Sequence, residues 1–149
     1  PSVKAIVRYA GDHYDAELGK TTATTSFMEG ADVIFQAAGP TGLGILEAAE
    51  DNKFLAIGVD TDQAYLHPGF IVSSMLKRLD TAVYDLVKKC CDKEELAKNV
   101  VYNVANDGIS LAENEEYKRI VPGDIQQKLT DIANKIASGE IVVKSYFDE

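Results

Sequence analysis

The chain has 149 residues, a length that fits a single globular domain. Hydrophobic residues make up 46% of it and charged residues 26%, which is typical of chains that fold around one core. The net charge of −9 repels phosphate backbones and argues against nucleic acid as a partner. The sequence contains neither a signal-peptide pattern nor a run of eighteen apolar residues.

The cysteine and histidine content argues against a structural metal site. The two cysteines, Cys90 and Cys91, are adjacent, so a disulfide between them would be strained. The two histidines, His13 and His67, stand far apart, and no CxxC or Cys/His cluster occurs. We therefore expect no metal ion and no other cofactor.

The first sixty residues alternate between strand and helix patterns. The expected strands lie at residues 4–9, 31–37 and 54–59, and the expected helices at about 16–28 and 43–51. Asp15 is a natural cap for the first of these helices, and Gly30 follows its end. Short β-α-β-α-β connections predict a parallel sheet with right-handed crossovers. The nearly continuous apolar run at 31–37 indicates a strand that is covered on both faces.

The remaining residues add further strands and two amphipathic helices. Strands are expected at 70–75, 100–105 and 141–144, and helices at about 79–90 and 125–136. The turn signal at 106–108 predicts a hairpin in which residues 109–111 return to pair with the strand at 100–105. The whole pattern predicts an α/β fold, a three-layer parallel sheet with helices on both faces.

Glycine and polar residues gather where the first three strands end. In parallel α/β sheets, ligands bind at these carboxyl ends. The turn at 39–42, Gly-Pro-Thr-Gly, joins a strand to a helix, so its N–H groups could bind an anion or a hydroxyl oxygen. Its glycines could equally serve turn geometry alone. The spacing of Gly39, Gly42 and Gly44 does not fit the dinucleotide fingerprint, and no Walker lysine follows.

Three other side chains in this region could bind a ligand. Asp60 could accept hydrogen bonds from vicinal hydroxyls, act as a general base, hold a metal with Asp62, or only cap a turn. Phe35 could stack on a planar base or belong to the core. Lys77 could reach a ligand oxygen, pair with Asp60, or be a solvated surface charge. No Ser-His-Asp or Cys-His motif accompanies them, so the sequence offers no catalytic set.

Four stretches taken together resemble one protein family. They are residues 30–39 leading into 41–44, 56–63, 73–77 with the residues up to 84, and, more weakly, 139–143. In this order they resemble the basic membrane protein family of lipoproteins, the purine-nucleoside-binding components of ABC transporters. The resemblance covers nearly the whole chain.

The resemblance implies a flavodoxin-like lobe of a type I periplasmic-binding-protein fold. Family members are longer and have two α/β lobes with a ligand cleft between them, and this chain resembles the C-terminal lobe. The N-terminal lobe, the signal peptide and the lipid-carrying cysteine are then expected outside residues 1–149. The helix at 79–91 is expected to pack on that missing lobe or on a partner chain.

The resemblance also implies a function and a location. The intact protein is expected to be a lipoprotein on the outer side of the cell membrane that serves an ABC transporter permease. It is expected to bind purine nucleosides without covalent chemistry and not to be an enzyme. The isolated lobe is expected to form a homodimer or to exchange segments, because the apolar stripe at 79–90 lacks its lobe partner.

Individual residues match the family's ligand-binding positions. By this resemblance Phe35 packs beside the nucleoside base, and Gly39 and the turn after it contact the ligand through the backbone. Asp60 binds the ribose hydroxyls, and Lys77 reaches toward the sugar. Pro40 replaces the glycine that is usual at its position, which removes one backbone N–H donor.

Two other functional classes stay open at the level of sequence. One is a flavodoxin-like, Mg²⁺-dependent enzyme in which Asp60 and Asp62 hold the metal or act as base. The other is a ligand-sensing domain of a regulator that uses the same fold.

Overall fold

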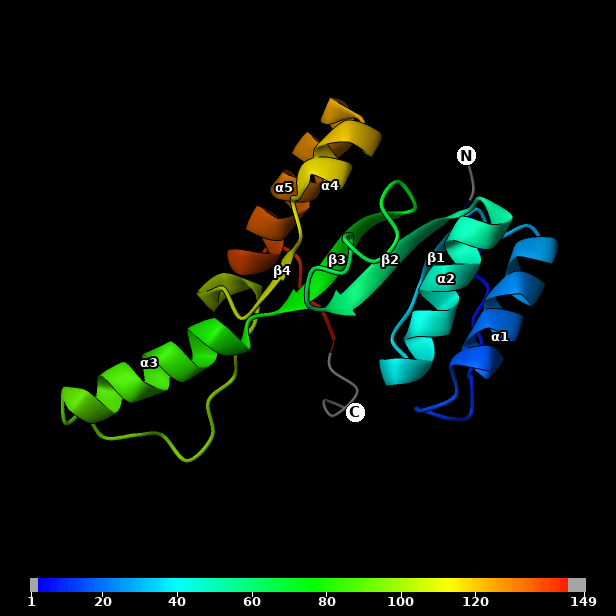
Figure 1. Cartoon of the computed structure of the whole chain (residues 1–149). Coiled ribbons are helices and arrows are strands. Elements are labelled where there is room, and N and C mark those ends of the chain that lie inside the picture. The colour runs from blue at the N-terminus through cyan, green and yellow to red at the C-terminus, as the bar shows by residue number, and fades with distance from the viewer. Residues whose placement is uncertain (1–2, 145–149) are drawn as a thin grey trace. The chain divides into compact units, whose positions relative to one another are not determined.

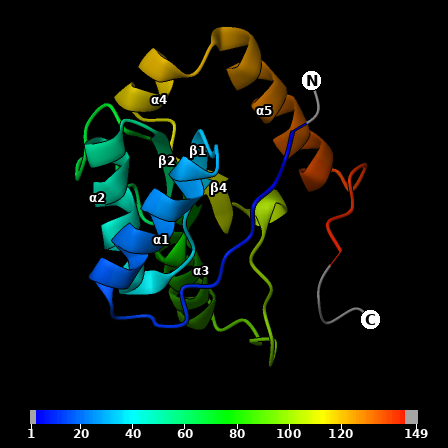
Figure 2. The ribbon, with the colours of Figure 1, turned by 90° about the vertical axis from the view of Figure 1, so that its right-hand side faces the viewer.

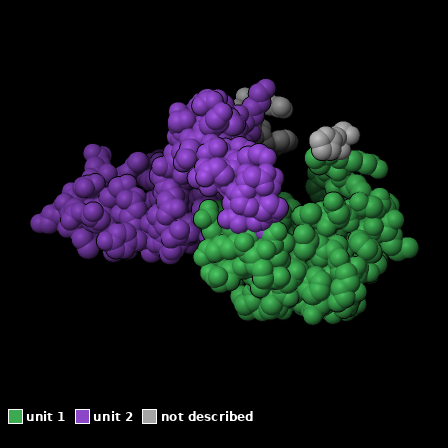
Figure 3. Space-filling model, turned by 90° about the horizontal axis from the view of Figure 1, so that it is seen from above, with its two compact units in different colours: residues 1–75, 111–120 green, residues 76–110, 121–149 purple. Residues whose placement is uncertain are grey.

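The computed structural model of the protein describes residues 3–144. These residues form two compact units, shown in different colours in Figure 3. Unit 1 comprises the described residues up to Met75 together with Leu111–Ile120, and unit 2 comprises Leu76–Ser110 together with the described residues from Val121 onward. Among the helices of this described part, none is long and apolar enough to span a membrane.

The elements of unit 1 follow the alternation that the sequence predicts. After an extended segment, they are α1 (Ala16–Met28), β1 (Val33–Phe35), the 3-10 turn η1 (Gly39–Thr41), α2 (Gly42–Asn52), β2 (Leu55–Asp60), most of β3 (Ile71–Lys77) and α4 (Glu115–Ile120) (Figure 1). The predicted bounds of α1 are confirmed. The Asp15 carboxylate accepts a hydrogen bond from the Leu18 N–H at 2.9 Å, and Gly30 follows the helix with φ +98°.

The parallel pairing predicted from the short crossovers is confirmed for β1 and β2. Their register places Val33 beside Leu55 and Phe35 beside Ile57. The described residues contain one four-stranded sheet with the order β1-β2-β3-β4, so β1 lies at its edge. β1 is shorter than the expected strand at 31–37, and it is half exposed rather than covered on both faces.

The predicted strand at 4–9 is wrong. Residues 4–9 are irregular, and no backbone hydrogen bond joins residues 4–11 to any other described part of the chain. Figure 2 shows this dark-blue segment as a coil that leads into α1. A β-branched run favours extended backbone, but it becomes a strand only when a neighbouring strand accepts its N–H groups.

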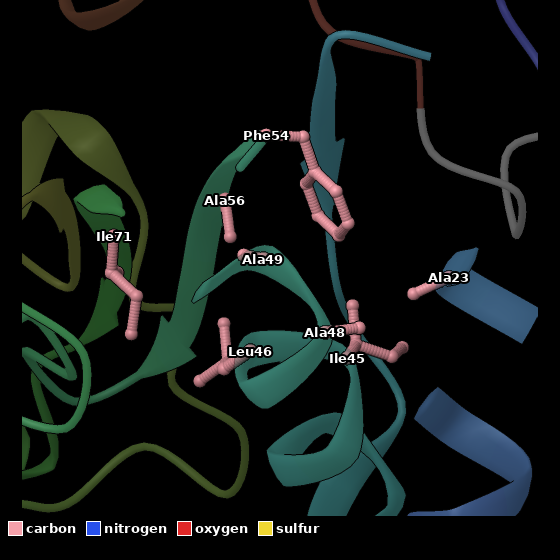
Figure 4. Packing of buried hydrophobic residues seen from close by; sticks show 8 residues of the cluster. All are labelled: Ala23, Ile45, Leu46, Ala48, Ala49, Phe54, Ala56 and Ile71. Atoms are coloured by element: carbon pink, nitrogen blue, oxygen red, sulfur yellow. The ribbon is translucent and has the colours of Figure 1, made fainter. Parts of the chain in front are cut away.

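The core of unit 1 lies between α2 and the strands β2 and β3. It is built from eight buried residues, which Figure 4 labels: Ala23, Ile45, Leu46, Ala48, Ala49, Phe54, Ala56 and Ile71. Four of them, Ile45, Leu46, Ala48 and Ala49, come from α2. Small side chains let α2 approach the sheet, and Leu46 fills the space at their centre without any exposed surface.

Helices α1 and α2 pack at backbone distance because of two glycines. A Cβ atom on Gly44 would lie 1.8 Å from the Ala16 carbonyl oxygen, and one on Gly19 would lie 2.1 Å from the Thr41 carbonyl oxygen. On the outer side of this contact, the Lys20 ammonium pairs with the Glu47 and Asp51 carboxylates at 2.7 Å each. These two hydrogen bonds, that to Asp51 first, raise the pKa of Lys20.

Unit 2 contains the two amphipathic helices that the sequence predicts at about 79–90 and 125–136, and the second is longer than predicted. They are α3 (Leu79–Cys91) and α5 (Gly123–Ala137), and the 3-10 turn η2 (Val104–Asn106) packs against α5. Asp124 lies in the first turn of α5, and Gly139 follows its end with φ +79°.

The predicted strand at 100–105 and its hairpin are wrong. The Asn103 side chain accepts from the Ala105 N–H at 2.9 Å, and the Asn106 side chain accepts from the Asn103 N–H at 2.6 Å. This reciprocal capping box bends the chain into η2 where a strand would have to stay extended. Residues 109–111 do form a strand, β4 (Ile109–Leu111), but its neighbour in the sheet is β3.

The predicted strand at 141–144 is also wrong. The Ile141 N–H donates to the Lys135 carbonyl at 3.0 Å, which is part of the C-terminal cap of α5. Residues 141–144 are irregular. Helix α4 was not predicted, because its six residues are too few to show a helical period.

Candidate functional site

The candidate site lies where β1 and β2 end in unit 1. Phe35 is the last residue of β1 and Asp60 the last residue of β2. Because the two strands are parallel and Phe35 stands beside Ile57, their carboxyl ends lie at the same edge of the sheet. The turn η1 follows β1 directly, so Gly39 and Pro40 belong to the same edge.

A pair of glutamines, of which Gln36 is buried and Gln63 is half-buried, joins these strand ends. Gln36 is 2% exposed, and its Nε2 donates to Oε1 of Gln63 at 3.0 Å. The same Gln63 oxygen accepts from the Val59 N–H at 2.9 Å, and the Gln63 N–H donates to Oγ of Ser74 at 3.1 Å. Hydrogen bonds thus connect the ends of β1 and β2 to the middle of β3 beneath the candidate site.

Two glycines leave the space that this pair occupies. A Cβ atom on Gly42 would lie 2.0 Å from Oε1 of Gln36. A Cβ atom on Gly58 would lie 2.6 Å from both Oε1 of Gln63 and Oγ of Ser74. Gly42 therefore makes room for the buried amide of Gln36.

The turn η1 is tied down by the fully buried side chain of Thr41. Its hydroxyl donates to the Asp12 carbonyl at 2.9 Å and accepts from the Asp15 N–H at 3.0 Å, while its own N–H donates to the His13 carbonyl at 3.0 Å. Gly39 adopts φ +59°, a conformation that glycine reaches without strain. Thr41 thus fixes the position of the turn against the loop before α1.

Most backbone donors of the turn are used within the chain. The Ala38 N–H donates to the Gln36 side chain at 3.2 Å, and the N–H groups of Thr41 and Gly42 donate to carbonyls. Pro40 has no N–H, and it stands at the start of η1, where a helical turn needs none. Within residues 38–42, all of which the structure describes, the Gly39 N–H is left as the donor for a ligand.

Asp60 and Asp62 differ in their surroundings. The Asp62 carboxylate accepts from the Ala64 N–H at 3.1 Å and from Nδ2 of Asn114 at 2.8 Å, which is a turn-holding role. Asp60 is exposed and has φ +68°, in the left-handed region that costs most side chains energy. Its backbone therefore turns sharply at the end of β2.

Phe35 belongs to unit 1, whereas Lys77 belongs to unit 2. Phe35 is 53% exposed, so its ring is not a core residue of the described unit. Lys77 is the last residue of β3 and falls in unit 2, where it is exposed. The structure brings Phe35, Gly39, Pro40 and Asp60 to one edge of unit 1.

Sequence reasoning missed the polar residues beneath this edge. Gln36 directly follows the apolar strand β1, and Gln63 comes shortly after the apolar strand β2. A glutamine at the end of an apolar run is the signal that could have indicated them. Their pairing is not visible in the sequence, because 27 positions separate them.

Comparison with known proteins places this chain in a family. A family model described as "ABC transporter substrate-binding protein PnrA-like" matches residues 1–146. The chain is 35% identical over 146 residues to Basic membrane protein D of Borreliella burgdorferi (strain JD1), covering 95% of this chain and 42% of that protein. It is 30% identical over 161 residues to the ABC transporter nucleoside-binding protein BmpA of Lactococcus lactis subsp. cremoris (strain MG1363), covering 96% of this chain and 44% of that protein. The chain thus spans less than half of the length of these relatives.

Solved structures share the fold. An ABC transporter solute-binding protein from Aeropyrum pernix K1 superposes with a TM-score of 0.80 at 23% identity, covering 99% of this chain and 50% of the other. A transcriptional activator of the comK gene from Bacillus halodurans superposes with a TM-score of 0.82 at 24% identity, covering 93% and 48%. The predicted α/β fold is therefore confirmed as that of the periplasmic-binding-protein-like solute-binding proteins. On the match across residues 1–146, the chain belongs to the family of PnrA-like ABC transporter substrate-binding proteins, the basic membrane proteins.

Proposed function

We propose that this chain is the C-terminal lobe of a receptor that binds purine nucleosides in a cleft between two lobes. The intact receptor is a lipoprotein on the outer side of the cell membrane, and it passes its ligand to an ABC transporter permease. Binding is non-covalent and needs no cofactor. A relative with 30% identity carries the name nucleoside-binding protein, which supports this choice of ligand.

The observation that carries the proposal is the edge formed by the ends of β1 and β2. It presents an exposed aromatic ring, a free backbone donor and an exposed carboxylate, supplied by Phe35, Gly39 and Asp60. A purine nucleoside offers a flat base that can stack on an aromatic ring and a ribose whose vicinal hydroxyls can both donate to one carboxylate. In this proposal the Gly39 N–H donates to a ligand oxygen or ring nitrogen.

The glutamine pair below this edge supports a preformed site. The hydrogen bonds of Gln36 and Gln63 fix the strand ends before any ligand arrives, which lowers the ordering cost of binding. Lys77 enters the proposal through the match of its sequence stretch, as a second group for the sugar oxygens. The apolar stripe of α3 packs on the other lobe or, in an isolated lobe, on a second copy.

Titration calorimetry with adenosine, guanosine, inosine and uridine tests the proposal. We expect the complete protein to bind purine nucleosides, and the 149-residue chain to bind them weakly because half of the cleft is absent. Asp60→Asn in the complete protein should weaken binding at least about tenfold, or roughly 1.4 kcal/mol, since one charge-assisted acceptor is lost.

Asp51→Asn is the matched control. It removes the same charge from the last turn of α2, at the opposite end of the helix from the site, and should leave nucleoside affinity unchanged. Equal losses in the two variants would mean that net charge, and not the position of Asp60, decides affinity. Absence of nucleoside binding by the complete protein would overturn the ligand assignment while leaving the family unchanged.

A further inference from the structure

The Gln63 side chain takes over where the hydrogen-bond ladder between β1 and β2 ends. The Gln36 N–H donates to the Ile57 carbonyl, so Ile57 turns its backbone groups toward β1. Because these groups alternate along a strand, Val59 also turns its N–H toward β1. β1 has ended at this level, and the Val59 N–H donates instead to Oε1 of Gln63 at 2.9 Å. The Gln63 carboxamide therefore lies between the carboxyl ends of the two strands.

The surrounding hydrogen bonds fix which way this carboxamide is turned. Its oxygen accepts from the Val59 N–H and, at 3.0 Å, from Nε2 of Gln36. A backbone N–H only donates, so the oxygen of Gln63, and not its nitrogen, faces Val59. The Ala38 N–H orients the Gln36 amide in the same manner, because it donates to Oε1 of Gln36 at 3.2 Å. The NH2 group of Gln63 therefore points away from the two groups that its oxygen binds.

This NH2 group is a donor that the described part of the chain does not use. Within residues 3–144, the side-chain oxygen of Gln63 accepts the two bonds above, and the side-chain nitrogen donates none. Gln63 is half-buried, so the group is not sealed in the core. In parallel α/β sheets, ligands bind outside the carboxyl ends of the strands, which is where this donor lies.

Gln63 and Asp60 offer complementary groups. The Gln63 oxygen is bonded to the backbone of Val59, the residue before Asp60, so both side chains belong to the end of β2. An ionised carboxylate only accepts hydrogen bonds, and an amide NH2 only donates them. A hydroxyl group has one hydrogen to donate and lone pairs that accept. One ribose hydroxyl can therefore donate to Asp60 and accept from Gln63.

We propose that Gln63 is a further ligand-binding residue, whose side-chain NH2 donates to a ribose hydroxyl oxygen of the nucleoside bound at Asp60. The proposal rests on the proposed function of this edge, and it narrows the ligand class to ribonucleosides. The hydrogens of both vicinal hydroxyls go to Asp60, and the bond from Gln63 holds one of the two oxygens from another side. A deoxynucleoside that lacks this hydroxyl loses both bonds at once.

Gln63→Glu in the complete protein separates this donor from the structural role of Gln63. Glutamate keeps an oxygen for the Val59 N–H and the Gln36 amide, but it replaces NH2 by a second acceptor. Adenosine or guanosine, whichever the complete protein binds, is titrated by calorimetry together with its 2′-deoxy and 3′-deoxy forms. We expect the variant to bind the ribonucleoside at least about tenfold more weakly. For the deoxy form that lacks the contacted hydroxyl, the loss should be less than about threefold.

Two controls accompany this variant. Its Tm should stay within about 3 °C of that of the unsubstituted protein, because both bonds to the side-chain oxygen remain. Gln127→Glu makes the same chemical change on exposed α5 and should leave nucleoside affinity unchanged.

A second measurement needs no variant and serves if Gln63→Glu does not fold. In NMR spectra of the unsubstituted complete protein, the side-chain N–H signals of Gln63 should shift when the ribonucleoside is added. They should shift less with the deoxy form that lacks the contacted hydroxyl.

Three outcomes would overturn the proposal and leave the proposed function intact. The first is unchanged or tighter binding of the ribonucleoside by Gln63→Glu. The second is an equal loss for the ribonucleoside and both deoxy forms, which would trace the effect to added charge or altered structure. The third is a set of Gln63 side-chain signals that do not respond to the ribonucleoside. If the unsubstituted complete protein binds no purine nucleoside, the proposed function fails, and this proposal fails with it.

Discussion

Gln36 donates from Nε2 to Oε1 of Gln63 across 3.0 Å, and this bond connects the ends of two strands beneath the candidate ligand edge. The Gln63 oxygen accepts a second bond from the Val59 N–H, so one amide group serves two strands at once. The hydrogen bonds of this glutamine pair form only when both strand ends are in register. The pair therefore fixes the relative position of the ends of β1 and β2 more strictly than apolar packing of the same size would.

Replacing Gln63 by leucine should destabilise the protein strongly. Leucine has a similar size, but it leaves the Gln36 Nε2 and the Val59 N–H without an acceptor, at a cost of about 1–3 kcal/mol each. We expect chemical denaturation to show a loss of about 3 kcal/mol. Gln127→Leu on exposed α5, where the side chain bonds only to Asp131, should change stability by less than about 0.5 kcal/mol.

Gly44→Ala should separate α1 from α2. In an isolated helix this exchange stabilises by about 1 kcal/mol, but here the new Cβ would stand 1.8 Å from the Ala16 carbonyl oxygen. We expect a net loss of about 2 kcal/mol or more, because backbone must shift to relieve the overlap. Gly123→Ala at the start of α5 has no atom within 4 Å of its Cβ and should be neutral or slightly stabilising. Equal effects of the two variants in thermal unfolding would contradict the close helix contact.

Thr41→Val tests how the turn η1 is held. Valine keeps the shape of the side chain but loses the bonds to the Asp12 carbonyl and the Asp15 N–H. Because Thr41 is fully buried, the stranded groups should cost about 2 kcal/mol in denaturation. Thr41→Ser retains both bonds and loses one methyl group, so it should cost less. A serine variant as unstable as the valine variant would assign the effect to packing alone.

In unit 2, the Asp85 carboxylate should report on the segment around Tyr102. It accepts from the Lys89 ammonium and the Tyr102 hydroxyl at 2.8 Å each, and these bonds, that of Lys89 first, lower the pKa of Asp85. A lowered folded-state pKa means that this contribution to stability is complete above the unfolded-state pKa and is lost as pH falls through the folded-state pKa.

Tyr102→Phe removes one of these two hydrogen bonds, so an NMR titration should show the pKa of Asp85 rising toward its ordinary value. Lys89→Gln removes the larger cause and should raise it further. In the phenylalanine variant, Asp85 should then contribute less to the pH dependence of the free energy of unfolding. An unchanged titration of Asp85 in Tyr102→Phe would show that the tyrosine bond does not form in solution.

Elements whose signals are local were predictable. The bounds of α1 follow from the Asp15 cap and Gly30, and the inward residues of α2 follow from helical spacing. The parallel pairing of β1 and β2 follows from the short connection between them. In each case a few neighbouring residues decide the structure, so a single sequence suffices.

Elements that depend on distant partners were not predictable. Residues 4–9 have the composition of a strand, but only a ladder partner makes one. Residues 100–105 do not form the predicted strand, because the side chains of Asn103 and Asn106 bond to nearby backbone. At the candidate site, the strand ends could be predicted, whereas the Gln36–Gln63 pair required the fold that brings them together.

The left-handed backbone of Asp60 restricts which residues can replace it. At φ +68°, glycine, asparagine and aspartate are accommodated with little strain, whereas alanine and branched residues distort the end of β2. Asparagine is thus the substitution that changes charge without disturbing the turn, and alanine would alter both. Of these three residues, only aspartate carries a charge, so aspartate alone combines a carboxylate with an unstrained turn at the end of β2.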